Sequence, residues 1–414
     1  MLAWRWAGVT RTVPPLALPT GSDGEGAVAM AGSLGGKSFT LARLPLTFAC
    51  GDSDSLGHRQ GGPGGHSPVS ADLVRNGSAE RFLVTGAYGC IGAWTVRQLV
   101  DEGVRVVTLD LSDDPRRLRL LLGEDELARL ERVTGDITDF EFVERTLDEY
   151  AITNVIHLAA LQVPFCRADP PLGARVNVVG TVNVLEAVAR RQERMAPLVY
   201  ASSIAAYEAI DDAGIRDASA HAGTPGTIYG VYKRANEGTA AVYWADRGLP
   251  SVGLRPHTVY GPARDQGVTS APTSAMLAAA AGMPFRIPYG GRYQIQYAPD
   301  VARAFVGASR TDGDGAAVHN LAGHPVHMSD VVEAIEAAAP EATGMITFDD
   351  ALLPFPDEVD STSLDGLLGP SRDTPLHSGV ADTIARFRRL ISDGLLAPVD
   401  DATKPLVESS ERSG

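Results

Sequence analysis

The stretch from Arg81 to Asp110, RFLVTGAYGCIGAWTVRQLVDEGVRVVTLD, constrains the fold of this chain more than any other segment. A short apolar run ends at Gly86, a segment with helical spacing follows, and a second apolar run ends at Asp110. This order predicts a β-strand, an α-helix and a second, parallel strand. Gly86, Gly89 and Gly92 fall at the first strand-to-helix turn, where a missing Cβ lets backbone amides approach a pyrophosphate. The three glycines alone also fit a turn that is merely tight.

The same alternation continues as far as residue 255 and predicts the fold class. The apolar runs ITNVIHLAA and PLVYASS are separated by segments with helical spacing. Strands without polar alternation indicate a sheet that is covered by helices on both faces. We therefore predict an α/β protein with a Rossmann-like, doubly wound parallel sheet over residues 79–255.

The two ends of the chain and its last third differ in texture from this body. Residues 256–397 contain Pro- and Gly-rich loops with short helices, which predicts mainly a smaller substrate-binding lobe and a C-terminal helix. Residues 1–78 are rich in glycine and show no sustained period, so we expect a disordered N-terminal extension. Residues 398–414 are polar and are expected to form a disordered tail.

Composition excludes several classes of function. The formal charge of −15 provides no excess of positive field for a nucleic acid. Cys50, Cys90 and Cys166 lack the spacing of metal ligands, so we expect no metal site and no disulfide framework, but reduced thiols in a cytoplasmic protein. No run of about 18 apolar residues is present, which argues against a membrane span.

Asp110 sharpens the interpretation of the glycine turn. It ends the second predicted strand, where a carboxylate can accept both ribose hydroxyls of NAD and repel the 2′-phosphate of NADP. The alternative is an ordinary acid at the start of a turn. Arg116 and Arg117 follow and can in principle favour NADP, but they lie further along the chain, so NAD is the expected cofactor.

A second constellation lies downstream. Ser203 ends the run YASS, and Tyr229 and Lys233 have Tyr-x-x-x-Lys spacing, which places both side chains on one face of a helix. An ammonium group lowers the pKa of a neighbouring phenol, so Tyr229 can exchange a proton with a substrate hydroxyl while Ser203 binds the same oxygen. A surface Tyr/Lys pair is the alternative. Tyr232 is adjacent but has the wrong offset.

The order of these motifs is informative as a set. TGAYGCIG, Asp110, GDITD, HLAA, NVVGTVNVLEA, YASS, YGVYK and LRPHTVYGP resemble the extended short-chain dehydrogenase/reductase superfamily, in its NAD-dependent epimerase/dehydratase group. The resemblance covers about residues 80–392 and implies an NAD-dependent enzyme that acts on a small sugar-like molecule, typically as a homodimer. It implies these cofactor-binding residues: Gly86, Tyr88, Gly89, Cys90, Ile91, Gly92, Asp110, Asp136, Ile137, Leu158, Ala159, Ala160, Asn177, Tyr229 and Lys233.

The chain departs from the family pattern where the reaction type is decided. In the dehydratases of this group an Asp-Glu pair follows the position of Ser203, and this chain has Ile204 and Ala205 there. Many nucleotide-sugar epimerases carry an Asn where Thr258 stands and an Arg where Tyr293 stands, with Arg292 one step away. A displaced arginine fork weakens the case for a diphosphate ligand, which favours a smaller polyol, sugar or ketone.

Polar residues on the predicted loops and strand ends complete the candidate site. The substrate-binding candidates are Gln162, Arg167, Ser203, His257, Thr258, Thr269, Ser270 and Arg292. The sequence thus predicts an NAD-dependent oxidoreductase with Ser203, Tyr229 and Lys233 as catalytic residues. A nucleotide-sugar epimerase with tightly retained NAD is the alternative, and a non-catalytic NAD-sensing protein is a third, which the intact catalytic set disfavours.

Overall fold

The computed structural model describes residues 80–207, 225–321, 323–353, 356–370 and 373–397, together with two short antiparallel strands, β1 (Ser33–Leu34) and β2 (Lys37–Ser38). The chain divides into two compact units, Met1–Ser70 and Ala71–Gly414. Apart from β1 and β2, the predicted N-terminal extension over residues 1–78 and the predicted tail over residues 398–414 lie outside the described residues. The second unit carries everything that follows.

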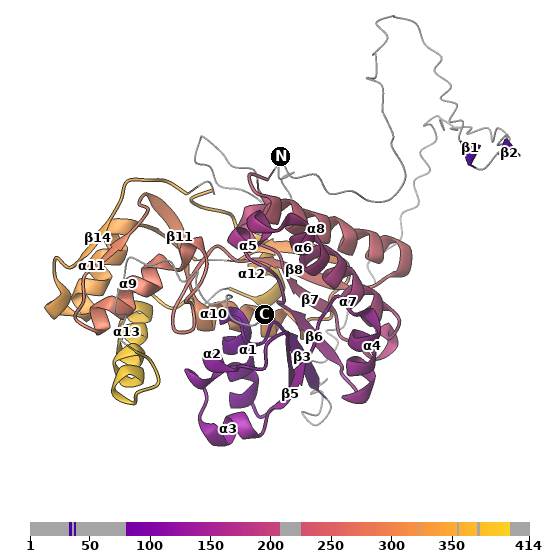
Figure 1. Ribbon diagram of the computed structural model, residues 1–414, viewed down its shortest axis with the longest axis horizontal. Helices are drawn as coiled ribbons and strands as arrows, with labels where there is room; N and C mark the ends of the chain where they lie inside the picture. The colour runs from indigo at the N-terminus through magenta and orange to yellow at the C-terminus, as the bar shows by residue number, and fades with distance from the viewer. Residues whose placement is uncertain are drawn as a thin grey trace, which may run out of the picture. The chain divides into compact units, whose positions relative to one another are not determined.

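A seven-stranded parallel sheet forms the centre of this unit, in the order β12-β8-β7-β6-β3-β4-β5 (Figure 1). Its strands are β3 (Arg81–Thr85), β4 (Arg105–Asp110), β5 (Glu131–Thr134), β6 (Asn154–His157), β7 (Leu198–Ala201), β8 (Ser251–Arg255) and β12 (Ala316–Asn320). The sheet confirms the predicted α/β, Rossmann-like fold.

Helices cover both faces of the sheet. One face carries α1 (Cys90–Asp101), α2 (Arg116–Arg119), α3 (Glu124–Ala128), α10 (Ala298–Ala308) and α12 (Thr362–Leu368). The other carries α4 (Phe140–Glu149), α7 (Gly180–Ala189) and α8 (Ile228–Arg247). Successive residues of β3 serve the two layers in turn, because Phe82 and Val84 join the core with α1 while Leu83 joins the core with α4. Full burial of such a side chain contributes about 1.5–3 kcal/mol.

Shorter elements connect β6 to α7 and β7 to α8. They are α5 (Val163–Ala168), α6 (Pro170–Ala174), the π-helical turn η1 (Arg175–Val179), η2 (Gln192–Arg194) and η3 (Ile204–Ala206). Among the described residues, the helical stretch Pro170–Ala189 is the one that is long and apolar enough to cross a membrane, with a mean hydropathy of 1.2. The structure buries 44 % of that window.

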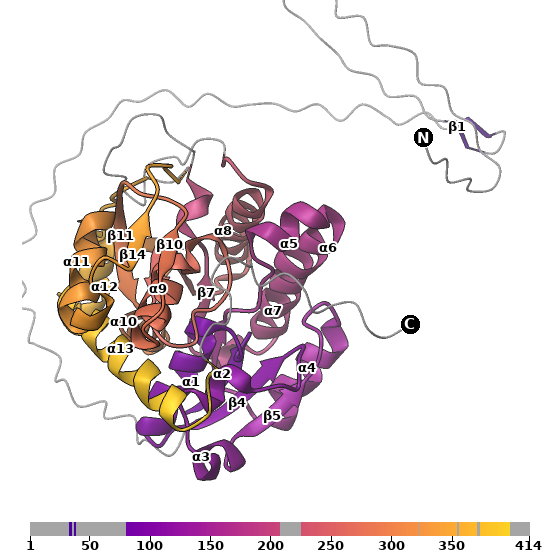
Figure 2. The same cartoon turned by 60° about the vertical axis from the view of Figure 1, so that its left-hand side comes forward.

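A smaller lobe lies beside the carboxyl ends of the strands (Figure 2). It contains β9 (Thr258–Tyr260), η4 (Val268–Ser270), α9 (Ala271–Ala280), β10 (Phe285–Ile287), β11 (Arg292–Tyr297), β13 (His324–His327), α11 (Met328–Ala338), η5 (Pro340–Ala342), β14 (Ile346–Phe348) and α13 (Leu376–Ser392). β11 pairs with β9 and β13, and β10 pairs with β14. Helices α9, α11 and α13 share one apolar core with these strands.

The chain returns from the lobe to the main sheet. β12 pairs with β8 in parallel over five residues, from Ala316 opposite Ser251 to Asn320 opposite Arg255. The predicted division at residue 255 does not anticipate this return. AAVHN carries little apolar signal, because an edge strand such as β12 is only partly buried.

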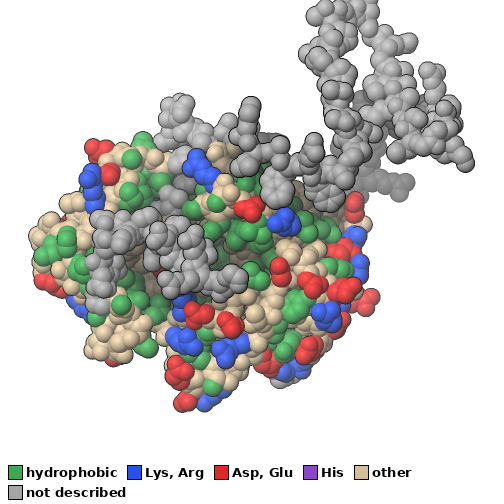
Figure 3. Space-filling view, viewed as in Figure 1, with side chains coloured by type: hydrophobic (Ala, Val, Ile, Leu, Met, Phe, Trp, Pro, Cys, Tyr) green, Lys and Arg blue, Asp and Glu red, His purple; other side chains and the backbone are tan. Residues whose placement is uncertain are grey.

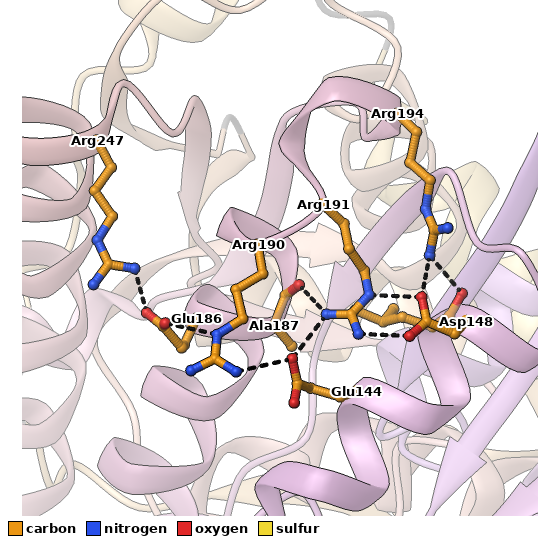
Figure 4. Close-up of polar contacts among 9 residues, drawn as sticks. Glu144, Asp148, Glu186, Ala187, Arg190, Arg191, Arg194 and Arg247 are labelled. Atoms are coloured by element: carbon orange, nitrogen blue, oxygen red, sulfur yellow. Dashed lines mark hydrogen bonds and ion pairs between the residues drawn. The ribbon is translucent and has the colours of Figure 1, made fainter.

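The outer helices are also joined by charged side chains (Figure 4). Arg191, which follows the C-cap of α7, contacts Asp148 at 2.6 Å and Glu144 at 3.1 Å, both on α4. Glu186 on α7 contacts Arg190 at 3.0 Å and Arg247 at the end of α8 at 2.5 Å. The network therefore links three helices that share one apolar core. Elsewhere charges of both signs lie close together on the surface, as around α2 and α3 (Figure 3).

Candidate active site

The glycine turn forms one end of a cleft at the carboxyl edge of the sheet. Gly86 has a φ of +65°, and a Cβ there would lie 2.6 Å from the backbone nitrogen of Ala159. A Cβ at Gly92 would lie 2.2 Å from the carbonyl oxygen of Gly86. Both positions therefore require glycine for a tight backbone approach. No side chain caps the first amides of α1, and no acid lies in its first turn, so this helix end fits a pyrophosphate.

Asp110 lies at the end of β4, beside this turn. Its Oδ2 accepts the amide hydrogen of Tyr88 at 2.9 Å, and its Oδ1 accepts that of Ser112 at 3.3 Å. Each carboxylate oxygen keeps a second lone pair, which the ribose hydroxyls of NAD can use. Arg117 and Arg116 are both paired with Asp265, at 2.7 and 3.6 Å. This arrangement agrees with NAD as the cofactor.

Ser203, Tyr229 and Lys233 meet at the other end of the cleft. Ser203 follows β7, and its hydroxyl lies close enough to the phenol of Tyr229 to lower the pKa of that phenol. Lys233 donates from Nζ to the carbonyl oxygen of Ala201 at 2.7 Å, and Nζ lies 5.5 Å from the ring centroid of Tyr229. Helix α8 reaches this position because Gly230 has no Cβ, which would lie 2.0 Å from the Ala205 carbonyl oxygen. The predicted catalytic set is thus assembled by one close helix-to-loop contact.

The pKa values in this cluster differ from the expectation. Burial raises the pKa of the Tyr229 phenol to about 12, and the hydrogen bond from Ser203 and the positive charge of Arg264 oppose the rise. Burial lowers the pKa of Lys233 to about 8, which the charges of Cys166 and Glu237 oppose. Sequence reasoning assigned the tuning of Tyr229 to Lys233. In the structure the desolvation of the phenol is the largest influence on its pKa, and Lys233 is not among the charges that act on it.

Asn177 lies behind the cleft. Its Oδ1 accepts the amide hydrogen of Leu161 at 2.7 Å, and its Nδ2 donates to the Leu161 carbonyl oxygen at 2.9 Å. The thiol of Cys166 contacts the same carbonyl oxygen at 3.3 Å. Asn177 is fully buried and is not among the lining residues. Its geometry fits a supporting role for the segment after β6, and its place among the cofactor-binding residues stays a prediction.

The cleft has a volume of about 920 Å³, near the upper end of the range for small-molecule sites. It holds the glycine turn and the catalytic residues in one continuous space. The predicted residues that line it are Gly86, Tyr88, Gly89, Cys90, Ile91, Gly92, Asp110, Asp136, Ile137, Leu158, Ala159, Ala160, Gln162, Ser203, Tyr229, Lys233, His257, Thr258 and Thr269.

Three predicted substrate residues lie elsewhere. Arg292 is half exposed at the start of β11 and pairs with Glu358 at 3.0 Å. Arg167 is exposed at the end of α5, and the Ser270 hydroxyl donates to the Gly267 carbonyl oxygen at 2.9 Å. Outside the cleft, an acidic side chain binds Arg292 and a backbone carbonyl binds Ser270, while Arg167 faces solvent.

His257 lines the cleft, and both of its ring nitrogens lie near protein oxygens. Its Nε2 lies 2.7 Å from the carbonyl oxygen of Pro356, and its Nδ1 lies 3.2 Å from Oγ1 of Thr258. Burial lowers the pKa of His257 to about 4, which keeps the ring neutral at pH 7. Within the described part of the chain, no group of three His, Cys, Asp or Glu side chains is placed to hold a metal ion.

Arg264 is one of the lining residues that the sequence did not predict, and it carries a charge. Its Nη2 donates to Oγ1 of Thr269 at 2.9 Å, and its Nε is buried without a hydrogen-bond partner. It also lies close enough to Tyr229 to influence the pKa of the phenol. An arginine two residues after the YGP that ends β9 was the available signal. A guanidinium with an unused donor in a cleft is suited to an anion.

Comparisons with known proteins agree with this geometry. A model of the NAD dependent epimerase/dehydratase family matches residues 82–322. The UDP-glucose 4-epimerase of Mycolicibacterium smegmatis is 32 % identical over 57 % of this chain and 75 % of its own length.

Two further comparisons extend this result. UDP-glucuronate 4-epimerase 5 of Arabidopsis thaliana is 33 % identical over 44 % of this chain, which spans only 42 % of that relative. The solved structure of the Thermus thermophilus UDP-glucose 4-epimerase in complex with NAD has a TM-score of 0.63 at 27 % identity, covering 74 % of this chain and 99 % of that one.

Proposed function

Since the chain belongs to the NAD-dependent epimerase/dehydratase family, we propose that it is an epimerase that inverts a secondary hydroxyl of a nucleotide-linked sugar. The observation that carries the proposal is the cluster of Ser203, Tyr229 and Lys233 in the same cleft as the glycine turn. Ile204 and Ala205 stand where a dehydratase needs an acid and a base for removing water, and both are buried and apolar. Oxidation without dehydration is therefore the chemistry that these residues support.

The residues divide the work as follows. Ser203 orients the substrate oxygen and hydrogen-bonds Tyr229, which takes the hydroxyl proton. The guanidinium of Arg264 supplies positive charge that favours ionisation of this phenol, and the ammonium of Lys233 lies 5.5 Å from the centre of its ring. Bound NAD would accept the hydride from the same carbon and return it to the opposite face.

Arg264 supports an anionic substrate. Thr269 fixes one end of its guanidinium, and Arg264 lines the cleft that also contains Tyr229. A diphosphate or a sugar carboxylate would pair with the positive charge of this guanidinium. The curated relatives named above act, by their names, on UDP-glucose and UDP-glucuronate, which carry such groups.

A net oxidoreductase acting on a smaller polyol, sugar or ketone is the second candidate, and it is the one that the sequence favoured. The position of Arg292 favours it, because an arginine paired with Glu358 outside the cleft offers no fork to a diphosphate. In that case Arg264 would bind a single carboxylate, or hydrogen-bond a neutral substrate.

One experiment separates the candidates. The purified protein is denatured, the NAD it releases is quantified, and the intact protein is incubated with UDP-glucose, UDP-glucuronate and a panel of free polyols. The epimerase predicts stoichiometric retained NAD and C4 epimers without net NADH. Net NADH from a polyol, with no retained NAD, would overturn the epimerase and support the oxidoreductase.

We also propose a cytoplasmic homodimer. Val179, Val231 and Val242 are 45–56 % exposed on η1 and α8, which is apolar surface that a second copy can cover. Sedimentation at several protein concentrations tests this, since Val231→Lys should shift the equilibrium to the monomer. A wild-type protein that stays monomeric at every concentration would contradict the homodimer.

A further inference from the structure

An ion-pair bridge joins the two walls of the cleft beside the glycine turn. Arg117 on α2 donates from Nε to Asp265 at 2.8 Å, and its Nη2 lies 2.7 Å from the same carboxylate. Asp265 belongs to the loop that follows β9, which is part of the lobe. Arg116 approaches the same carboxylate at 3.6 Å. One aspartate of the lobe is thus held by two arginines of the nucleotide-binding body.

The bridge is tied to the glycine turn itself. The third nitrogen of the Arg117 guanidinium, Nη1, donates to the carbonyl oxygen of Tyr88 at 2.8 Å. Tyr88 lies between Gly86 and Gly89, and its amide donates to Asp110. Arg117 is therefore fixed at the turn that faces the pyrophosphate, and its side chain is only 14 % exposed.

The loop that carries Asp265 has a constrained shape. Trp94 on α1 donates from its ring nitrogen to the carbonyl oxygen of Pro262 at 2.9 Å, which anchors the loop at a second point. Ala263 has a φ of +73°, a conformation that costs a non-glycine residue about 1–2 kcal/mol. This turn places Arg264 on the cleft and Asp265 on Arg117. Strain that persists only because contacts hold it is common at functional positions.

The bridged loop forms the wall opposite the glycine turn. Gln266 and Gly267, directly after Asp265, line the cleft together with Gly89 and Arg117. A dinucleotide on the turn therefore lies in a space that α2 bounds on one side and this loop on the other. The ion pairs hold these two walls together and so oppose a widening of the cleft around the dinucleotide.

We propose that the Arg117–Asp265 bridge is a strap that retains NAD in the cleft. The inference rests on the proposed function in one respect, because an epimerase must keep its reduced cofactor until the hydride returns. It assigns to Asp265 a role in retaining NAD, although the negative charge of this side chain by itself opposes NAD binding. A carboxylate near a pyrophosphate repels it, so without a strap the loss of this charge would tighten NAD binding.

The direction in which one substitution changes the dissociation rate of NAD therefore tests the strap. The full-length protein is loaded with radiolabelled NAD and chased with excess unlabelled NAD in the absence of substrate. Asp265→Asn keeps the shape of the side chain and removes the charge, and it is expected to raise the dissociation rate by about fivefold to tenfold. A rate that is unchanged or slower would overturn the strap.

Two further variants provide a control and a second test of the strap. Arg145→Gln removes a surface ion pair with Glu141 on α4, away from the cleft, and should leave the dissociation rate unchanged. Arg117→Lys keeps the charge but loses the fork, and should also accelerate dissociation. A wild-type rate in Arg117→Lys would overturn the strap.

Circular dichroism at 25 °C checks that each variant is folded. Because no substrate is present, faster release in Asp265→Asn supports the strap whether or not the protein epimerises a sugar. Absence of epimerisation would count against the proposed function alone.

Discussion

Glu237 and Arg255 form a bidentate ion pair in the interior, with Nε and Nη2 of the guanidinium 2.7 and 2.8 Å from the two carboxylate oxygens. The side chains are 5 % and 1 % exposed. Glu237 also accepts a hydrogen bond from the hydroxyl of Ser202, the neighbour of Ser203. The pair therefore ties α8, which carries two catalytic residues, to β8 and to the loop that carries the third.

Loss of this pair should destabilise the protein strongly. Glu237→Gln leaves the buried Arg255 without its counter-charge, which costs about 3–5 kcal/mol of unfolding free energy. Urea unfolding measures it. Arg234→Gln is the matched control, because Arg234 also binds Glu237 but is 36 % exposed, and its loss should cost less than about 1 kcal/mol. Equal effects of the two variants would contradict the argument.

Tyr229→Phe should remove catalysis and keep the cofactor site. The expected loss in turnover is about 10²- to 10⁴-fold, since the proton acceptor is gone while the fold and NAD binding are preserved. Tyr232→Phe provides the comparison on the same helix, because the Tyr232 hydroxyl donates to the Pro170 carbonyl oxygen at 2.8 Å. Turnover in that variant should stay near the wild-type value. Similar losses in both would refute the assignment of Tyr229.

Lys233 should make stability depend on pH in a defined window. Burial lowers its pKa to about 8, whereas an unfolded lysine titrates near 10.4. Below pH 8 the ammonium is charged in both states, and its burial costs the folded state about 3 kcal/mol. Between pH 8 and 10.4 the folded protein releases the proton first, so the cost disappears as the pH rises.

Lys233→Met tests that sign. At pH 7 the variant should be inactive yet up to about 3 kcal/mol more stable than the wild type, less about 1 kcal/mol for the lost hydrogen bond to Ala201. Urea unfolding at pH 7 and pH 10 compares the two proteins. The advantage of the variant should shrink as the pH approaches 10. If the difference in unfolding free energy between the two proteins stayed constant with pH, the charge of Lys233 would not be what destabilises the folded protein.

Gly92→Ala should damage the cofactor site, since the new Cβ would lie 2.2 Å from the Gly86 carbonyl oxygen and neither backbone can yield cheaply. We expect NAD binding, followed by calorimetry, to weaken by at least about tenfold. Gly238→Ala is the control on the exposed face of α8, where a Cβ meets nothing within 4 Å. That variant should gain up to about 1 kcal/mol of stability and bind NAD normally.

The sequence predicted the parts of the site that rest on local spacing. The glycine turn, Asp110 and the pair Tyr229 and Lys233 each lie within one strand-to-helix turn or one helical face, so their geometry follows from secondary structure alone. Arg264 was missed because its place in the cleft depends on the left-handed backbone of Ala263, which no period in the sequence encodes.

Two other expected site residues, Arg292 and Asn177, lie outside the lining of the cleft for a similar reason. Arg292 was expected in the cleft on the basis of its neighbour in the family pattern, but successive residues of a strand point to opposite faces, and β11 turns Tyr293 into the lobe core instead. Asn177 was expected among the cofactor-binding residues, and its buried side chain binds the backbone of Leu161. Contacts between distant segments decide both cases.

The return of β12 to the sheet bears on how the protein is made. Its partner β8 leaves the ribosome first. While the lobe segments between β8 and β12 are still being translated, the edge of β8 that will pair with β12 keeps free amides and carbonyls. The order of synthesis therefore delays completion of the sheet until residue 320 has emerged. A polypeptide that ends at residue 255 would keep every catalytic residue but would expose the unpaired edge of β8. We therefore expect it to aggregate and not to act as a minimal enzyme.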